Sequence, residues 1–277
     1  MTAPGGSSEY RPQSLAAFEN AVGLVERGIE QIRAEWGYLI DRINAYLDKV
    51  RKEVEDSSLF EIMYEAVWGD IKQNVETIKR MVETARAAVD KLLEQAQKSV
   101  AGSIPVASLF SRAYDLGERV NRPLTGMYGD MTGSGDIDFW RGPAKITYEK
   151  RVGDQQDAVT NASGKVKTLA TYLGDAATAN MTYMASLGDR LATILKTIIT
   201  TGLDILALEA GALTQVIAAL SHLSELIGTA VEQSIGYVTT LGTRIAEVLN
   251  QILALQTENS DLTGLTPDGR WPSPVAS

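Results

Sequence analysis

The sequence predicts an all-α protein, an elongated helical bundle of two long antiparallel hairpins with coiled-coil-like packing. Apolar residues recur at alternating steps of three and four residues along most of the 277-residue chain, which aligns them on one face of a helix. Short polar or glycine-containing breaks separate these stretches, and short connections are typical of antiparallel neighbours. Hydrophobic residues make up 44% of the chain, enough for a substantial core.

The first predicted hairpin covers residues 14–102, after a Pro/Gly/Ser-containing tail at residues 1–13 that we expect to be disordered. A capping box at Ser58 and Glu61 indicates where its second helix begins, and Gly102 suits the left-handed conformation that ends many helices. The apolar stripe of its first helix, over residues 14–54, consists of Leu15, Phe18, Val22, Val25, Ile29, Ile32, Trp36, Leu39, Ile43, Tyr46 and Val50. The stripe of its second helix consists of Ile71, Val75, Ile78, Val82, Ala85, Val89, Leu92 and Ala96.

Residues 103–139 break this periodicity with prolines and glycines, and predict a short helix near 106–121 followed by a Gly-rich linker. A loop of this length is longer than most connections within compact domains. We therefore expect the boundary between two halves of the protein here.

The second predicted hairpin covers residues 140–256, and residues 257–277 form a second tail that we expect to be disordered. Pro143 suits the first position of a helix that runs to about residue 200. Gly202 follows as either a turn or only a kink, and these two alternatives stay open. A last helix spans about 203–256.

Composition argues against several classes of function. The net charge of −9 disfavours nucleic acid as a partner, because phosphate binding needs clustered Lys and Arg. The chain has no cysteine and a single histidine, His222, so a catalytic triad or a metal site is difficult to build. We accordingly predict no catalytic residues, no cofactor and no metal, and a protein that is not an enzyme.

The last helix carries no Lys or Arg from Leu203 to Thr243, and its remaining positions are mostly small or apolar. Such a helix is usually buried on more than one side. The structural interpretation is that this is a central helix of the bundle. The functional interpretation is that it presents a face for self-association, or for membrane contact through Ile194–Ile227. Charged residues interrupt that stretch too often for a typical membrane-spanning helix.

Trp140 and Gly142 open a helix after a Gly-rich loop, with Ala144, Tyr148, Val152, Gln155 and Ala158 downstream. This pattern resembles the WXG100 (ESAT-6-like) superfamily, helical hairpins exported by type VII (ESX) secretion systems. In that family the tripeptide forms the turn between two helices, and a Tyr-x-x-x-Asp/Glu element completes the export signal. Tyr114 and Glu118 have this spacing and precede Trp140, an order that resembles single-chain PE–PPE-like substrates.

The resemblance implies a secreted or cell-surface protein that is cytoplasmic before export and binds the type VII machinery. The first residues lack the apolar core of a Sec signal peptide, which agrees with such a route. The chain departs from the family in its length and in its N-terminal hairpin. Its own partners would be itself or another helical protein, bound through apolar stripes.

Two other classes of function stay open. One is an α-helical pore-forming or membrane-active toxin, which would hide an apolar hairpin around Ile194–Ile227 in its soluble form. The other is an intracellular coiled-coil scaffold protein that is never exported. Leakage of dye from liposomes distinguishes the first of these, and cell fractionation the second.

Overall fold

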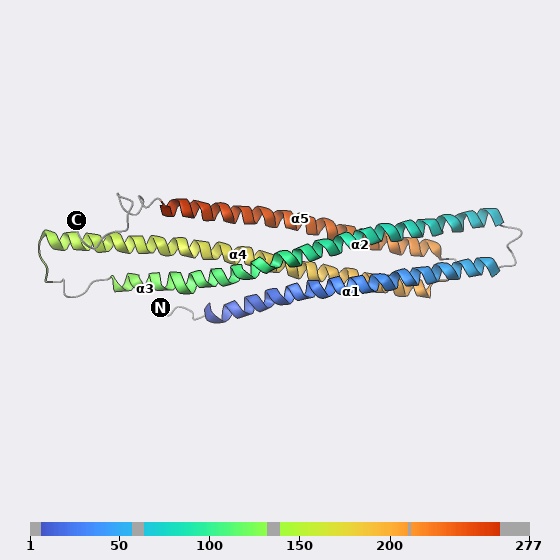
Figure 1. The fold of residues 1–277 in the computed structure, drawn as a ribbon, viewed down its shortest axis with the longest axis horizontal. Coiled ribbons are helices and arrows are strands. Elements are labelled where there is room, and N and C mark those ends of the chain that lie inside the picture. Colours follow the sequence, from blue (N-terminus) through green and yellow to red (C-terminus); the bar gives the residue numbers. More distant parts are fainter. Residues whose placement is uncertain (1–6, 57–63, 132–138, 210–211, 261–277) are drawn as a thin grey trace. The chain divides into compact units, whose positions relative to one another are not determined.

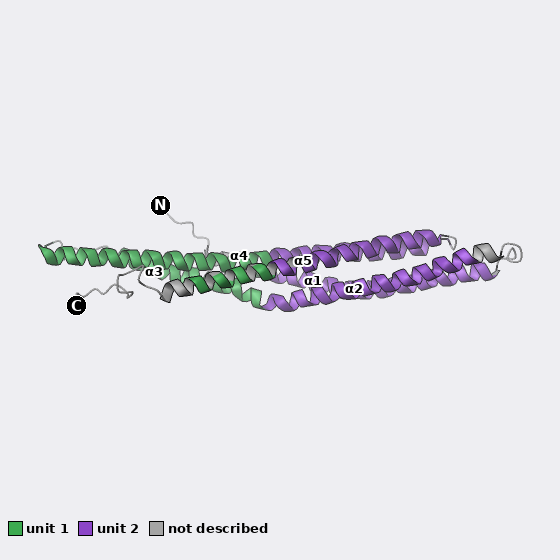
Figure 2. Cartoon of the chain, turned by 90° about the horizontal axis from the view of Figure 1, so that it is seen from above, with its two compact units in different colours: residues 1–16, 105–180, 241–277 green, residues 17–104, 181–240 purple. Residues whose placement is uncertain are grey.

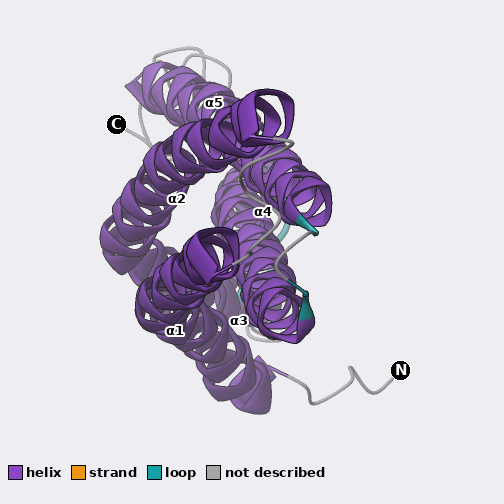
Figure 3. Cartoon of the chain, turned by 90° about the vertical axis from the view of Figure 1, so that its right-hand side faces the viewer, coloured by secondary structure: helices purple, strands orange, loops and turns teal. Residues whose placement is uncertain are grey.

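The computed structural model describes residues 7–56, 64–131, 139–209 and 212–260, and throughout these residues the regular elements are helices (Figures 1 and 3). The all-α prediction is confirmed. The elements are the α-helices α1 (Ser7–Asp56), α2 (Tyr64–Asp115), α3 (Arg122–Asp130), α4 (Pro143–Ala207) and α5 (Leu213–Ser260), and the π-helix η1 (Leu116–Asn121). The expected capping box at Ser58 and Glu61 and most of the expected C-terminal tail lie outside the described residues.

The chain divides into two compact units, each built from segments that are distant in sequence (Figure 2). Unit 1 comprises residues 1–16, 105–180 and 241–277, and unit 2 comprises residues 17–104 and 181–240. The expected hairpins 14–102 and 140–256 are therefore not the compact units. The reason is that the apolar stripes of α1 and α2 are buried together with those of α4 and α5, so neither hairpin completes a core by itself.

The core of unit 2 largely follows the predicted stripes. Nine of the eleven predicted stripe residues of α1 are buried, namely Phe18, Val25, Ile29, Ile32, Trp36, Leu39, Ile43, Tyr46 and Val50. From the other three helices the core takes Ile78, Ala85, Val89, Leu92 and Ala96 of α2, Leu187, Leu191, Ile194, Ile198 and Ile205 of α4, and Leu213, Val216, Leu220, Leu223 and Ile227 of α5. Eight apolar side chains of the Ile194–Ile227 stretch thus lie in the core, which agrees with the interpretation of this segment as part of the bundle interior.

Helices α1 and α4 approach each other closely at glycines. A Cβ atom on Gly28 would lie 2.9 Å from Cβ of Leu191, and one on Gly202 would lie 2.5 Å from Nη1 of Arg42. Gly202 is therefore a point of close approach within helix α4, which continues to Ala207, so the alternative of a turn at this residue is wrong. At Gly202 the close approach requires the absence of a side chain and not an unusual backbone conformation.

A pair of glycine substitutions in α1 tests this close approach. We expect Gly28→Ala to lower the free energy of unfolding by about 1 kcal/mol, because inserting an atom into a packed interface costs more than the gain in helix propensity. At Gly37 an added Cβ would meet no atom within 4 Å, so Gly37→Ala should instead raise stability by about 0.5–1 kcal/mol. Urea denaturation followed by circular dichroism measures both, and equal effects would contradict the inferred packing.

The turn between α4 and α5 is held by side chains of α1. Tyr46 Oη donates a hydrogen bond to the carbonyl of Glu209 at 3.2 Å, and Lys49 Nζ donates to the carbonyl of Leu208 at 3.1 Å. Carbonyl groups at a helix C-terminus lack partners within the helix, and a cation there also favours the helix dipole. Burial raises the pKa of Tyr46, which keeps its hydroxyl protonated as a donor.

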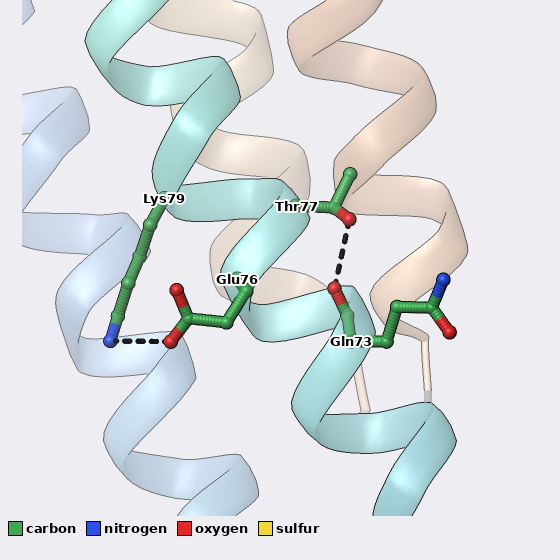
Figure 4. A network of polar contacts seen from close by, with 4 residues as sticks. All are labelled: Gln73, Glu76, Thr77 and Lys79. Carbon is green, nitrogen blue, oxygen red and sulfur yellow. Dashed lines mark hydrogen bonds and ion pairs between the residues drawn. The ribbon is translucent and has the colours of Figure 1, made fainter.

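Helix α2 carries local polar contacts between residues three or four positions apart (Figure 4). Lys79 Nζ lies 3.4 Å from Oε1 of Glu76, and the Thr77 hydroxyl donates to the carbonyl of Gln73 at 2.8 Å. Both charged side chains are more than half exposed, so the pair adds little to stability.

Unit 1 differs from the prediction for residues 103–139. Helix α2 does not end at Gly102 but continues through Pro105 to Asp115, where η1 and then α3 follow. Val106 is buried directly after the proline, which explains why the helix continues. The two units divide at Pro105, where the helix loses one backbone hydrogen bond. Near the N-terminus, helix α1 begins earlier than expected, at Ser7 rather than at residue 14.

The apolar side chains of unit 1 are less completely covered than those of unit 2. Its described buried residues are Val106, Ala158, Val159, Ala177 and Asn180. Several large apolar side chains of this unit are exposed, among them Phe139 and Ile146. Over the described part of the chain, no helix has a segment long and apolar enough to span a membrane.

Candidate functional site

The turn at Gly142 is the most distinctive backbone feature of unit 1. Gly142 has φ of +81°, and it is the one residue with positive φ among those that the structure describes. A side chain is disfavoured in this conformation. Helix α4 begins at the next residue, Pro143, as predicted, and Lys145 N–H donates to the carbonyl of Gly142 at 3.2 Å. The glycine therefore sets the direction in which α4 starts.

Trp140 lies just before this turn and packs against the first part of α4. Its ring centroid is 5.9 Å from that of Tyr148, with the planes tilted by 58°. This distance is within the range of favourable aromatic pairs. Trp140 nevertheless remains 47% exposed. About half of a large aromatic surface is left available to a partner.

Tyr114 and Glu118 lie on a different part of unit 1, where α2 changes into η1. The backbone N–H of Arg122 donates to the carbonyl of Gly117, five residues earlier, which is the hydrogen bond of a π-helix. Glu118 lies within this π-helix and forms an ion pair of 3.1 Å with Arg122. Single π-helical turns are frequent at functional sites. The Gly117 that interrupts the Tyr-x-x-x-Glu element is thus accommodated in a helix of wider turns.

Helix α4 is tied to this π-helix by a contact that the sequence did not indicate. The Ser163 hydroxyl donates to Oδ1 of Asn121 at 2.6 Å, across 42 residues of sequence. Both residues are polar and neither belongs to an apolar stripe, so a periodicity analysis has no means of pairing them. The contact fixes the end of η1 on α4 within unit 1.

The candidate residues thus fall into two separate places. Trp140 and Gly142 form the turn into α4, whereas Tyr114 and Glu118 lie at the junction of α2 and η1, before α3 in the chain. The aromatic partner that the structure gives to Trp140 is Tyr148. His222 is exposed on α5. No group of three or more potential metal ligands occurs among the described residues.

Comparison of the chain with protein-family models, curated proteins and solved structures gives no significant match.

Proposed function

We propose that this chain is a non-enzymatic helical protein of the kind exported by type VII secretion, acting through helix-mediated binding to itself or to another helical protein. The observation that carries this proposal is the Gly142 turn. Its positive φ is the conformation that a turn-forming glycine of the Trp-x-Gly tripeptide would need, directly before the first residue of a long helix.

Two features of unit 1 support the part of the proposal that concerns binding. Trp140 is about half exposed, and Phe139 and Ile146 on either side of the turn are 84% and 69% exposed. Exposed apolar side chains that cluster in sequence around one turn are more typical of an interaction surface than of isolated surface residues. The exposed faces of η1 and α3 add Val120, Met127 and Tyr128.

Export of tagged variants by the native strain tests the proposal. We expect Trp140→Ala and Gly142→Ala each to reduce the amount of protein in the culture filtrate to background, while the protein accumulates in cells. Alanine at residue 142 strains the turn by about 1–2 kcal/mol, and alanine at residue 140 removes the exposed ring. Arg141→Ala, at the variable position of the tripeptide, is the matched control and should be exported normally.

Circular dichroism of the purified variants shows whether a loss of export reflects a lost export signal or a lost fold. Glu118→Gln, which keeps the shape of the side chain but removes its charge, tests the second half of the proposed signal in the same assay. Unchanged export of the Trp140 and Gly142 variants, or of the native chain in a strain without the secretion system, would rule out this function.

The α4–α5 hairpin supports a second candidate function, that of a membrane-active protein. Leu203 and Leu206 are 53% and 55% exposed on the last turns of α4, next to a turn that α1 holds through Tyr46 and Lys49. Dye-loaded liposomes, neutral and anionic and at several pH values, test this candidate. Absence of leakage under all conditions would remove it, and a protein found only in the cytosolic fraction would favour a scaffold role instead.

A further inference from the structure

A cavity of about 410 Å³ lies between α4 and α5 in unit 2. Its volume is within the range of small-molecule sites in proteins. Apolar and hydrogen-bonding side chains share its wall. The lining residues are Thr182, Tyr183, Ser186, Leu187, Arg190, Gln233, Ser234 and Thr240.

Arg190 is the one charged residue among the described residues of this lining, although the chain as a whole carries a net charge of −9. It is half-buried, and it makes neither a hydrogen bond nor an ion pair with any residue that the structure describes. Asp189 and Glu232 are close to the lining residues in sequence, but both are exposed and neither lines the cavity. The guanidinium group therefore has five donors and a positive charge without a partner in the described structure.

The positive charge acts on the inner wall of the cavity. Tyr183 is 7% exposed, and its hydroxyl shares a hydrogen bond of 2.8 Å with the Ser99 hydroxyl. Burial raises the pKa of Tyr183, while the hydrogen bond with Ser99 and the charge of Arg190 act in the opposite direction. The Arg190 charge is thus near the Tyr183 hydroxyl, and the buried Leu187 side chain provides an apolar surface in the same wall.

A larger groove, of about 700 Å³, lies between α1 and α2. It differs in its charges from the cavity between α4 and α5. Acidic and basic residues both line that groove, and two of its cations have partners. Arg51 pairs with Glu55 at 2.9 Å and Lys79 with Glu76 at 3.4 Å. Two of the basic residues in that groove are thus paired with acidic residues of the protein, whereas Arg190 has no such partner among the described residues.

We propose that the cavity between α4 and α5 binds a small organic anion, whose carboxylate or phosphate head pairs with Arg190 and whose apolar part lies against Leu187 and Tyr183. Guanidinium groups form strong, paired hydrogen bonds with both kinds of head group. Partial burial strengthens such a pair relative to one in open water. This site is independent of the proposed export signal, because every residue that lines it belongs to unit 2.

Isothermal titration of the full chain with four probes of one tail length tests the ligand class. The probes are octanoate, octyl phosphate, octanol and octylammonium. We expect both anions to bind, and octanol and octylammonium to bind at least about tenfold more weakly, because they lack the charge-assisted bond to Arg190. The ratio of the two anion affinities shows whether a carboxylate or a phosphate is preferred.

Three variants locate the binding. Arg190→Gln should weaken anion binding at least about tenfold, and Arg190→Lys should retain part of it. Ser186→Phe, which keeps Arg190 but fills the cavity from an exposed position, should abolish it. Arg86→Gln, which removes an exposed arginine of α2, is the matched control and should bind like the native chain.

Circular dichroism shows that each variant is folded before its binding is interpreted, and Ser186→Phe keeps the test decisive if an Arg190 variant does not fold. The proposal is overturned if neither anion binds, if octanol binds as tightly as octanoate, or if binding survives both Arg190→Gln and Ser186→Phe.

Discussion

A fragment of residues 14–102, the first hairpin alone, is expected not to unfold cooperatively. The stripe of α1 is buried against the second half of the chain as well as against α2. Gly28 of α1 meets Leu191, Tyr46 bonds to the α4–α5 turn, and Ser99 of α2 bonds to Tyr183. Without these partners the fragment exposes apolar surface that the intact unit removes from water, and burial of such surface is the main force for folding.

Urea denaturation followed by circular dichroism measures this effect. The full chain should show a sigmoidal transition, and the fragment a shallow one, because the slope of unfolding scales with the surface exposed. Mixing fragment 14–102 with fragment 140–256 should restore a sigmoidal transition, since together they contain nearly all of unit 2. A steep transition for fragment 14–102 alone would show that the first hairpin is an independent domain after all.

The second large effect is expected for Leu220 in α5. This side chain is completely buried, and Leu220→Ala should lower the free energy of unfolding by about 2–5 kcal/mol, because it removes buried apolar atoms and leaves a cavity. Leu206→Ala in α4 is the matched control. Leu206 is 55% exposed, so its truncation should change stability by no more than about 0.5 kcal/mol.

This pair of substitutions also separates two interpretations of the apolar α4–α5 segment. If α5 were a peripheral helix whose apolar face waits for a partner, Leu220→Ala would change the stability of the isolated chain as little as Leu206→Ala. Denaturant titration of both variants at one protein concentration distinguishes these outcomes.

The helical content and most of the α1 stripe were predictable from the sequence, because alternating steps of three and four fix which side chains share a face. Helix breaks were less predictable. Gly102, Pro105 and Gly202 are signals that often end a helix, yet α2 and α4 continue through all three. Neighbouring packing determines these positions: Val106 is buried beyond the proline, and Arg42 occupies the space that a side chain on Gly202 would take.

The candidate site was only partly predictable. The start of α4 at Pro143 and the turn glycine before it follow from local chemistry, since proline suits a first helical position and glycine a positive φ. The π-helix at Glu118 and the contact between Ser163 and Asn121 carry no signal of this kind. The contact depends on how α4 packs within unit 1.

By itself, the sequence determined that this protein is helical, where its longest apolar stripes lie and which residues open α4. Only the tertiary structure decided that residues 17–104 and 181–240 share one core, and that Arg190 lies in the wall of a cavity without a counter-ion among the described residues. The physical reason is that periodicity records which face of a helix avoids water. It does not record which other helix covers that face, because any apolar stripe of similar shape satisfies the same requirement.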